Sequence, residues 1–428
     1  MKIYNDPEKE NWKQLCERPQ LSLEFLESAV RNILNRVKKS GDEGLRELTL
    51  QFDKATISSL QVTETEIGNA IKTLPDGLKR SIEAAAANIR KFHSAQKREE
   101  LKIETMPGVT CWRKAVPISK VGIYIPGGSA PLFSTVLMLG IPATLAGCQE
   151  IVLCTPPDRN GNINPAILFA AKTVGVSKIF RVGGAQAIGA LAFGTESIPN
   201  VFKIFGPGNQ YVTKAKQIVT EEGIAIDLPA GPSEVLVFAD RSANPSFVAA
   251  DLLSQAEHGE DSQVMLVLLD DSILPSIQAE IEKQLKDLPR KLIAEKALAN
   301  SRVVTFPDKS RALDFINQYA PEHLIMNVAN SEEAVDAIVN AGSVFIGNYS
   351  PEAVGDYASG TNHTLPTNGY AKAYAGVSLD SFMKYITYQQ ITERGIKAIG
   401  PIVEQMAEAE ELMGHKNAVS IRLNTLSK

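Results

Sequence analysis

The sequence predicts an α/β protein with two parallel-sheet domains, and three observations support this expectation. From about residue 102 onward, short apolar runs alternate with helical stretches, as in a mostly parallel sheet that helices cover on both faces. This alternation runs to about residue 234 and restarts at 235. A length of 428 residues also leaves room for more than one domain.

Composition and charge narrow the class of protein. Apolar residues make up 44% and charged residues 22% of the chain, which is typical of globular proteins. The net charge of −5 argues against a nucleic-acid partner. No run approaches the roughly 20 apolar residues of a membrane helix, and the first residues lack the apolar core of a signal peptide. The four cysteines form no Cys-x-x-Cys pair, so we expect a reduced, cytoplasmic location. We also expect no membrane partner, because no apolar run is long enough to span a membrane.

The predicted elements follow from periodicity. Residues 21–100 are expected to be helical because apolar residues recur there at helical spacing, with a second helix over 40–52 and two more within 64–98. Residues 102–112 alternate like a strand or hairpin. The first α/β segment is expected to have strands near 121, 150, 178 and 203. The second is expected to have strands at 235–239, 263–269, 302–306, 324–327 and 343–346, with helices between them.

The expected domains follow from these elements. Residues 1–20 are polar and are expected to form an arm, and residues 123–234 form one complete α/β domain. We expect the helices of 21–122 to pack on residues 235–365, which would make that catalytic domain discontinuous. Residues 366–428 are expected to form a helical tail, except that 417–423 alternates like a strand.

Three glycine turns follow strands of the first α/β segment. They are Pro126-Gly-Gly-Ser, Gly183-Gly-Ala-Gln and Gly206-Pro-Gly-Asn. Such turns at the carboxyl ends of parallel strands are typical of phosphate or nucleotide sites. None fits Gly-x-Gly-x-x-Gly, and tight turns that merely close a sheet have the same composition. Spacing alone therefore leaves the ligand undecided.

The stretch from Asp251 to Gln263 suggests part of a metal site. Gln255 and His258 are three residues apart at a helix end, so both side chains would lie on one face. The chain has five histidines. His93 is expected on an exposed basic helix face, whereas His323, His363 and His415 lie in loop-like segments. Four ligands of types that zinc accepts would be Gln255, His258, Asp356 and His415.

Glu322 and His323 are adjacent in a predicted turn between a helix and a strand. A carboxylate and an imidazole that enter one cleft are suited to general acid/base catalysis. A surface glutamate beside a structural histidine is the alternative. His363 follows Asp356 in a small-residue loop and would be a ligand or an orienting partner.

Several motifs together resemble the histidinol dehydrogenase family. They are Tyr124-Ile-Pro-Gly-Gly, Phe205-Gly-Pro-Gly-Asn, Asp227-Leu-Pro-Ala-Gly-Pro-Ser-Glu, Ser254-Gln-Ala-Glu-His-Gly, Pro321-Glu-His, Gly355-Asp-Tyr-Ala-Ser-Gly-Thr-Asn-His and His415-Lys-Asn-Ala-Val. The resemblance covers about residues 20–424. It implies two Rossmann-like domains and the four-electron oxidation of L-histidinol through L-histidinal to L-histidine, the last step of histidine biosynthesis. It also implies two NAD+ per reaction, one zinc ion per site, and a homodimer with shared sites.

The resemblance also implies a role for each residue. Gln255, His258, Asp356 and His415 would bind zinc, and Glu322 and His323 would be the acid/base pair. Tyr124, Gln186 and Asn209 would contact NAD+. Substrate contacts would come from Ser233, Gln255, His258, His323, Asp356, His363, Glu410 and His415, with Glu410 and His415 supplied by the partner chain.

The chemistry implied for the second oxidation needs a hydrated aldehyde or a thiohemiacetal. Cys111, Cys148 and Cys154 have no sequence setting that would activate a thiolate. Water addition assisted by Glu322, with His323 as proton acceptor, is therefore favoured. Two alternatives remain open: a zinc-dependent hydrolase, and a non-catalytic nucleotide-binding protein.

Overall fold

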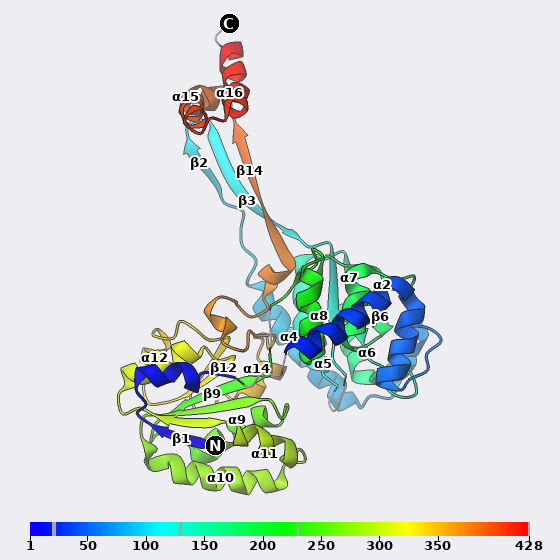
Figure 1. Cartoon of the computed structure of the whole chain (residues 1–428), viewed down its shortest axis with the longest axis vertical. Coiled ribbons are helices and arrows are strands. Elements are labelled where there is room, and N and C mark those ends of the chain that lie inside the picture. Colours follow the sequence, from blue (N-terminus) through cyan, green and yellow to red (C-terminus); the bar gives the residue numbers. More distant parts are fainter. Residues whose placement is uncertain (19–22, 128–130, 229–230, 427–428) are drawn as a thin grey trace.

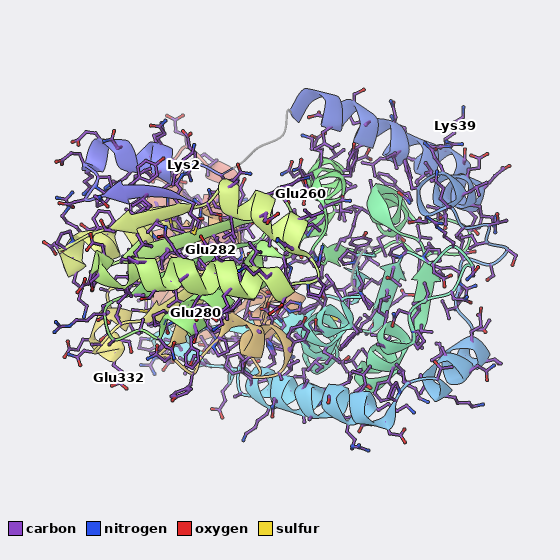
Figure 2. The ribbon with its side chains drawn as sticks, turned by 90° about the horizontal axis from the view of Figure 1, so that it is seen from below. Lys2, Lys39, Glu260, Glu280, Glu282 and Glu332 are labelled. Atoms are coloured by element: carbon purple, nitrogen blue, oxygen red, sulfur yellow. The ribbon has the colours of Figure 1, made fainter. Side chains whose placement is uncertain are left out.

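The computed structural model describes residues 1–18, 23–127, 131–228 and 231–426. It shows two α/β units, each built on a parallel sheet, and a long extension that projects from them (Figure 1). The two units lie side by side when viewed from below, with Lys39 on the outer helix of one and Glu280 and Glu282 on a helix of the other (Figure 2). Within these ranges, no helix is long and apolar enough to span a membrane.

The first unit is built on five parallel strands in the order β6-β5-β4-β7-β8. They are β4 (Lys120–Tyr124), β5 (Glu150–Thr155), β6 (Lys178–Arg181), β7 (Lys203–Phe205) and β8 (Ala225–Ile226). The helices between them are α5 (Phe133–Ala146), α6 (Pro165–Val174), α7 (Gly184–Phe193) and α8 (Gln210–Thr220). The central strand β4 is almost wholly buried, which explains its uninterrupted apolar sequence.

The second unit contains β9 (Glu234–Ala239), β10 (Gln263–Leu268), β11 (Arg302–Thr305), β12 (His323–Asn327) and β13 (Ser343–Ile346). Its helices are α9 (Pro245–Ala256), α10 (Leu274–Asp287), α11 (Lys291–Ala299), α12 (Lys309–Tyr319), α13 (Ser331–Val335) and α14 (Glu352–Tyr357). The parallel order β11-β10-β9-β12-β13 is the order of the first unit, with the first strand of each in the centre. This confirms the prediction of two parallel-sheet units of similar plan.

The first residues belong to the second unit and do not form a separate arm. Strand β1 (Lys2–Asn5) pairs with the edge strand β11, and α1 (Trp12–Leu15) follows a short 3-10 turn at Lys9–Asn11. Trp12 and Leu15 are buried in the second unit's core. The expectation of an arm is wrong because backbone pairing to an edge strand leaves little trace in side-chain polarity.

The N-terminal helices pack on the first unit, so the expected packing on the second is wrong. Helix α2 (Leu23–Asp53) lies against α7 and α8, α3 (Glu64–Lys72) against α6, and α4 (Asp76–Ser94) against α5. Gly41, at φ +50°, breaks α2 where two separate helices were predicted. Amphipathic periodicity shows that a helix has a buried face, but it does not identify the surface that covers it.

The extension is an antiparallel sheet that ends in two helices (Figure 1). The predicted hairpin forms β2 (Lys102–Met106) and β3 (Val109–Pro117), and β14 (Met383–Ile391) pairs along β3. Helices α15 (Glu393–Ala409) and α16 (Met413–Leu426) form its tip. The tail is therefore only partly helical, and residues 417–423 lie in α16 instead of the predicted strand.

Candidate active site between the two units

Glu322 and His323 lie where β12 begins, at the amino ends of the second unit's strands. Helix α12 ends at Tyr319, the C-cap residue Ala320 has φ +53°, and Pro321 then prevents a further helical turn. The Ser343 amide donates to the Glu322 carbonyl at 2.9 Å. At Gly342 a Cβ atom would lie 2.5 Å from that carbonyl, so only glycine permits this approach. The backbone therefore fixes both side chains.

The His323 imidazole is buried among three carboxylates. Its Nδ1 lies 3.2 Å from the Glu234 carbonyl oxygen, 3.7 Å from Glu322 Oε2 and 4.0 Å from Glu352 Oε2. Its Nε2 lies 3.5 Å from Asp356 Oδ1 and is buried without a hydrogen-bond partner among the described residues. When Nδ1 donates to the carbonyl, Nε2 keeps its lone pair and can accept a proton.

The ionisable groups of this cluster have shifted pKa values. Burial raises the pKa of Glu322 to about 8 and that of Glu352 to about 8, against the opposing charge of His323. Burial alone would lower the pKa of His323, but Glu352 and Glu322 hold it well above its usual value. Burial acts to raise the pKa of Asp356, but the neighbouring imidazole of His323 holds it low. Such shifts are typical of acid/base sites.

Two of the four predicted metal ligands meet in this cluster. Donor atoms of His258, Glu352 and Asp356 all lie within 4.8 Å of one another. Gln255 lies beside them, with its amide nitrogen oriented to donate to Glu352 and its oxygen to accept from the Glu234 amide at 3.0 Å. One chain thus gathers one imidazole with carboxylate and amide oxygens, a donor set suited to zinc.

His363 joins the cluster to the first unit. Its Nδ1 donates to the Asp356 carbonyl at 2.8 Å, and its Nε2 lies 3.0 Å from the Thr135 hydroxyl on α5. The neighbouring Asn362 donates to the Met138 carbonyl of the same helix at 2.7 Å. The loop after α14 therefore fixes the cluster against the amino-terminal half of α5.

The first unit has a cavity of about 1450 Å³ at the carboxyl ends of its strands. Tyr124, Gln186 and Asn209, one from each predicted glycine turn, all line it. Residues of α2 and α3, including Asp53 and Glu66, also line it. Residues 128–130 of the first turn and 229–230 of the Asp227–Glu234 motif lie outside the described residues. Pro131 lines the cavity four residues before Thr135, so α5 connects the cavity with the cluster.

Tyr124 contributes to this cavity in a way that sequence did not show. Its hydroxyl accepts a hydrogen bond from the Gly184 amide at 3.1 Å, and Gly184 has φ +63°. At the next turn the Asn209 side chain caps α8 by accepting from Val212 N at 3.1 Å. The turns are thus held in shape by the residues that line the cavity.

The remaining predicted residues lie elsewhere. Glu410 and His415 are exposed at the tip of the extension and do not reach the cluster of their own chain. Ser233 directly precedes β9 and is partly buried. His93 is fully buried in α4, so its expected exposure is wrong: its ring packs inward despite the basic residues around it.

Sequence reasoning missed three contributors to the cluster: Glu352, Glu234 and Thr135. Glu352 precedes Asp356 by four residues, a spacing that places both carboxylates on one face of a helix and could have indicated the pair. Glu234 contributes main-chain atoms, and Thr135 acts across the two units. No local pattern reveals either contribution.

This arrangement defines a class of protein. A cavity large enough for a dinucleotide lies at the switch point of one sheet, and a buried acid/base pair with metal-type donors lies at the edge of the other. These are the features of an α/β oxidoreductase.

Comparisons with known proteins identify the family. The histidinol dehydrogenase family model matches residues 16–423. A histidinol dehydrogenase of Bacteroides thetaiotaomicron is 59% identical over 426 residues, covering 100% of both chains. One from Escherichia coli is 50% identical over 428 residues, covering 99% of this chain and 98% of its own. The crystal structure of histidinol dehydrogenase from Elizabethkingia anophelis has a TM-score of 0.98 at 57% identity, covering 100% and 99% of the two chains.

The chain belongs to the histidinol dehydrogenase family, an NAD-dependent oxidoreductase family of histidine biosynthesis. The predicted family is therefore confirmed. The alternatives of a zinc hydrolase and of a non-catalytic nucleotide-binding protein are not supported.

The hydrogen bond of the Tyr124 hydroxyl predicts an effect on the binding of NAD+. Tyr124→Phe should raise the KM for NAD+ about five- to tenfold, because the lost hydrogen bond to Gly184 is worth roughly 1 kcal/mol and shapes the cavity wall. Tyr4→Phe in β1, on the other unit, is the control and should leave this KM unchanged. Steady-state kinetics of both variants checks it, and equal KM values would show that the hydroxyl does not shape the cofactor site.

Proposed function

We propose that this protein uses zinc and two NAD+ to oxidise L-histidinol through L-histidinal to L-histidine, with each active site shared by two chains. The observation that carries the proposal is the buried His323, next to Glu322 and to the donors of His258 and Asp356. NAD+ would bind in the cavity of the first unit and accept a hydride in each oxidation.

His323 is suited to accept the proton of the substrate hydroxyl. Its Nε2 has no other partner among the described residues, and the neighbouring carboxylates raise its pKa and so strengthen it as a base. In the first oxidation His323 would accept the hydroxyl proton of the alcohol as its hydride leaves to the bound cofactor. In the second, it would accept a hydroxyl proton of the hydrated aldehyde in the same way.

Glu322 is suited to activate the water that hydrates the aldehyde. Its carboxyl group is buried, with a pKa of about 8, and one oxygen accepts from the Glu234 amide at 2.9 Å. The thiohemiacetal route lacks support because burial raises the pKa of Cys148 to about 11 and raises that of Cys154 still further. Burial likewise raises the pKa of Cys16 to about 11.

The residues of one chain fit part of a zinc site. His258, Asp356 and Gln255 would hold the ion with His415 of a second chain, and Glu352 would orient the Gln255 amide. The ion, when bound, would hold the amino and imidazole nitrogens of histidinol. The chain's own groups, His323 and Glu322, would then lie beside the reacting carbon.

The shape of the chain supports a dimer. Each chain carries Glu410 and His415 on an extension that projects away from its own cluster (Figure 1). The tip exposes Met406, 60% accessible, and Met413, 54% accessible. Close to the cluster, α14 and the loop before it expose Tyr349, Val354 and Tyr357. Docking the tip of one chain on this surface of another would cover both apolar patches and complete both sites.

The zinc assignment is tested by metal content. His258→Asn and His415→Asn should each lower bound zinc and abolish NADH formation from histidinol, because each removes an imidazole ligand. His363→Asn is the matched control: it should lose activity but keep its zinc, since it binds main chain and Thr135. Elemental analysis of the purified variants checks this, and chelation should likewise abolish turnover by wild type. Unchanged zinc in the first two variants would contradict the assignment.

The proposed role of Glu322 in activating water predicts that its loss affects the second oxidation more than the first. Glu322→Gln should slow the oxidation of supplied histidinal by about 10²–10⁴-fold, the usual effect of lost acid/base help, and slow the alcohol step less. Single-turnover measurements with histidinol and with histidinal check this. Equal losses on both substrates would refute a role confined to water.

Shared sites predict that two inactive variants restore each other. Heterodimers of His323→Ala with His415→Asn chains should reach about half of wild-type activity, because one of their two sites has every group in place. Heterodimers of His323→Ala with His258→Asn chains are the control and should stay inactive, because both changes lie on the body of a chain and leave no intact site. Inactive heterodimers in both mixtures would show that each tip serves its own chain.

A further inference from the structure

A buried ion pair lies directly behind the acid/base pair. Arg18 Nε lies 2.7 Å from Glu234 Oε2, and its Nη2 lies 3.0 Å from Glu234 Oε1, so the guanidinium binds both carboxylate oxygens. The two side chains are only 8% and 1% exposed. Arg18 also donates to the Tyr319 and Cys16 carbonyls at 2.8 and 2.9 Å and stacks on the Tyr319 ring at 3.7 Å. Together these contacts hold the plane of the guanidinium group in one orientation.

The main chain of Glu234 holds the two residues proposed as acid and base. Its amide donates to Glu322 Oε2 at 2.9 Å, and its carbonyl accepts from His323 Nδ1 at 3.2 Å. The same amide faces the oxygen of Gln255 at 3.0 Å. One peptide segment at the start of β9 therefore orients Glu322, His323 and Gln255, while its side chain is tied to Arg18.

Only an arginine fits this position. A lysine would supply one point charge where the structure uses a planar fork against two carboxylate oxygens and an aromatic ring. The pair also lies in the core, where an imperfectly bonded carboxylate would draw in water or move. Loss of the fork would therefore move the first residue of β9, and the groups bonded to its peptide would move with it.

We propose that Arg18 is a positioning residue that acts through Glu234 to hold Glu322 and His323 in their catalytic orientation. The inference rests on the proposed function for the roles of those two residues. It also assigns a role to the N-terminal segment: β1 pairs with the edge of the second sheet (Figure 1), and Arg18, which follows α1, binds Glu234 at the start of β9.

The test compares Arg18→Lys with Arg302→Lys. Arg302 is a matched control because it donates to the Leu15 and Glu17 carbonyls and so anchors the same segment without touching Glu234. Arg18→Lys should lower kcat for both oxidations by about 10–100-fold, since small misplacement of catalytic groups has effects of that order. Its KM for NAD+ should stay within about twofold, because the cavity lies in the other unit. Arg302→Lys should keep the wild-type kcat even where its melting temperature falls equally.

Equal loss of kcat in both variants, or none in Arg18→Lys, would overturn the proposal, because the pair would then be only structural. If Arg18→Lys fails to fold, the double variant Arg18→Met with Glu234→Met removes both buried charges and should keep the fold. The proposal expects a low kcat from this stable variant, and a wild-type kcat would refute it.

Hydrogen exchange separates this inference from the proposed function. The Glu234 amide should exchange about tenfold faster or more in Arg18→Lys than in wild type or Arg302→Lys, since its acceptors are displaced. This measurement needs no turnover. A wild-type protein that forms no NADH from histidinol would refute the proposed function, while the exchange rates would still decide whether Arg18 holds this peptide.

Discussion

The burial of His323 among Glu322, Glu352 and Asp356 is the constraint on which the second unit depends. Such a cluster is costly to bury unless each group has a partner or shares a proton. The start of β9 supplies the amide and carbonyl that two of these groups need, and Arg18 fixes that strand from behind. The same burial raises the pKa values of Glu322 and Glu352 to about 8, and these carboxylates in turn raise the pKa of His323 against the effect of its own burial.

The two units have the same strand order but use opposite ends of their sheets. The first unit opens its cavity at the carboxyl ends, the usual ligand position in parallel sheets. The second places its acid/base pair at the amino ends, where β9 and β12 begin. Because α5 contacts His363 through Thr135 and follows Pro131 of the cavity wall, the two sites meet along one helix. In the proposed function, this shared helix would hold the hydride acceptor and the base in a fixed position relative to each other.

The sequence predicted what local pattern determines. Alternating strands and helices identified both units. The glycine turns indicated a ligand site at the carboxyl ends of the first sheet, and the family resemblance named Tyr124, Gln186 and Asn209, which line the cavity there. Helical spacing predicted that Gln255 and His258 lie on one face, and both lie beside Glu352 in the cluster. The sequence did not predict partners distant in sequence: which unit covers α2, which edge strand binds β1, or that Glu234 acts through its main chain. These depend on tertiary packing, which neither periodicity nor residue type encodes.

The same limit explains the extension. Residues 366–428 were expected to form a helical tail, and the structure instead gives part of them a strand, β14, paired with β3. That pairing gives the extension a folded sheet that carries α15 and α16 at its tip (Figure 1), with Glu410 at the end of α15 and His415 in α16. A flexible tail would lose conformational entropy when its ligands entered a second chain's site, whereas a preformed arm has already lost most of it on folding. In the proposed dimer, the antiparallel sheet therefore positions the His415 imidazole of one chain in the site of the other. Its position there would be nearly as well defined as that of a ligand from the same chain.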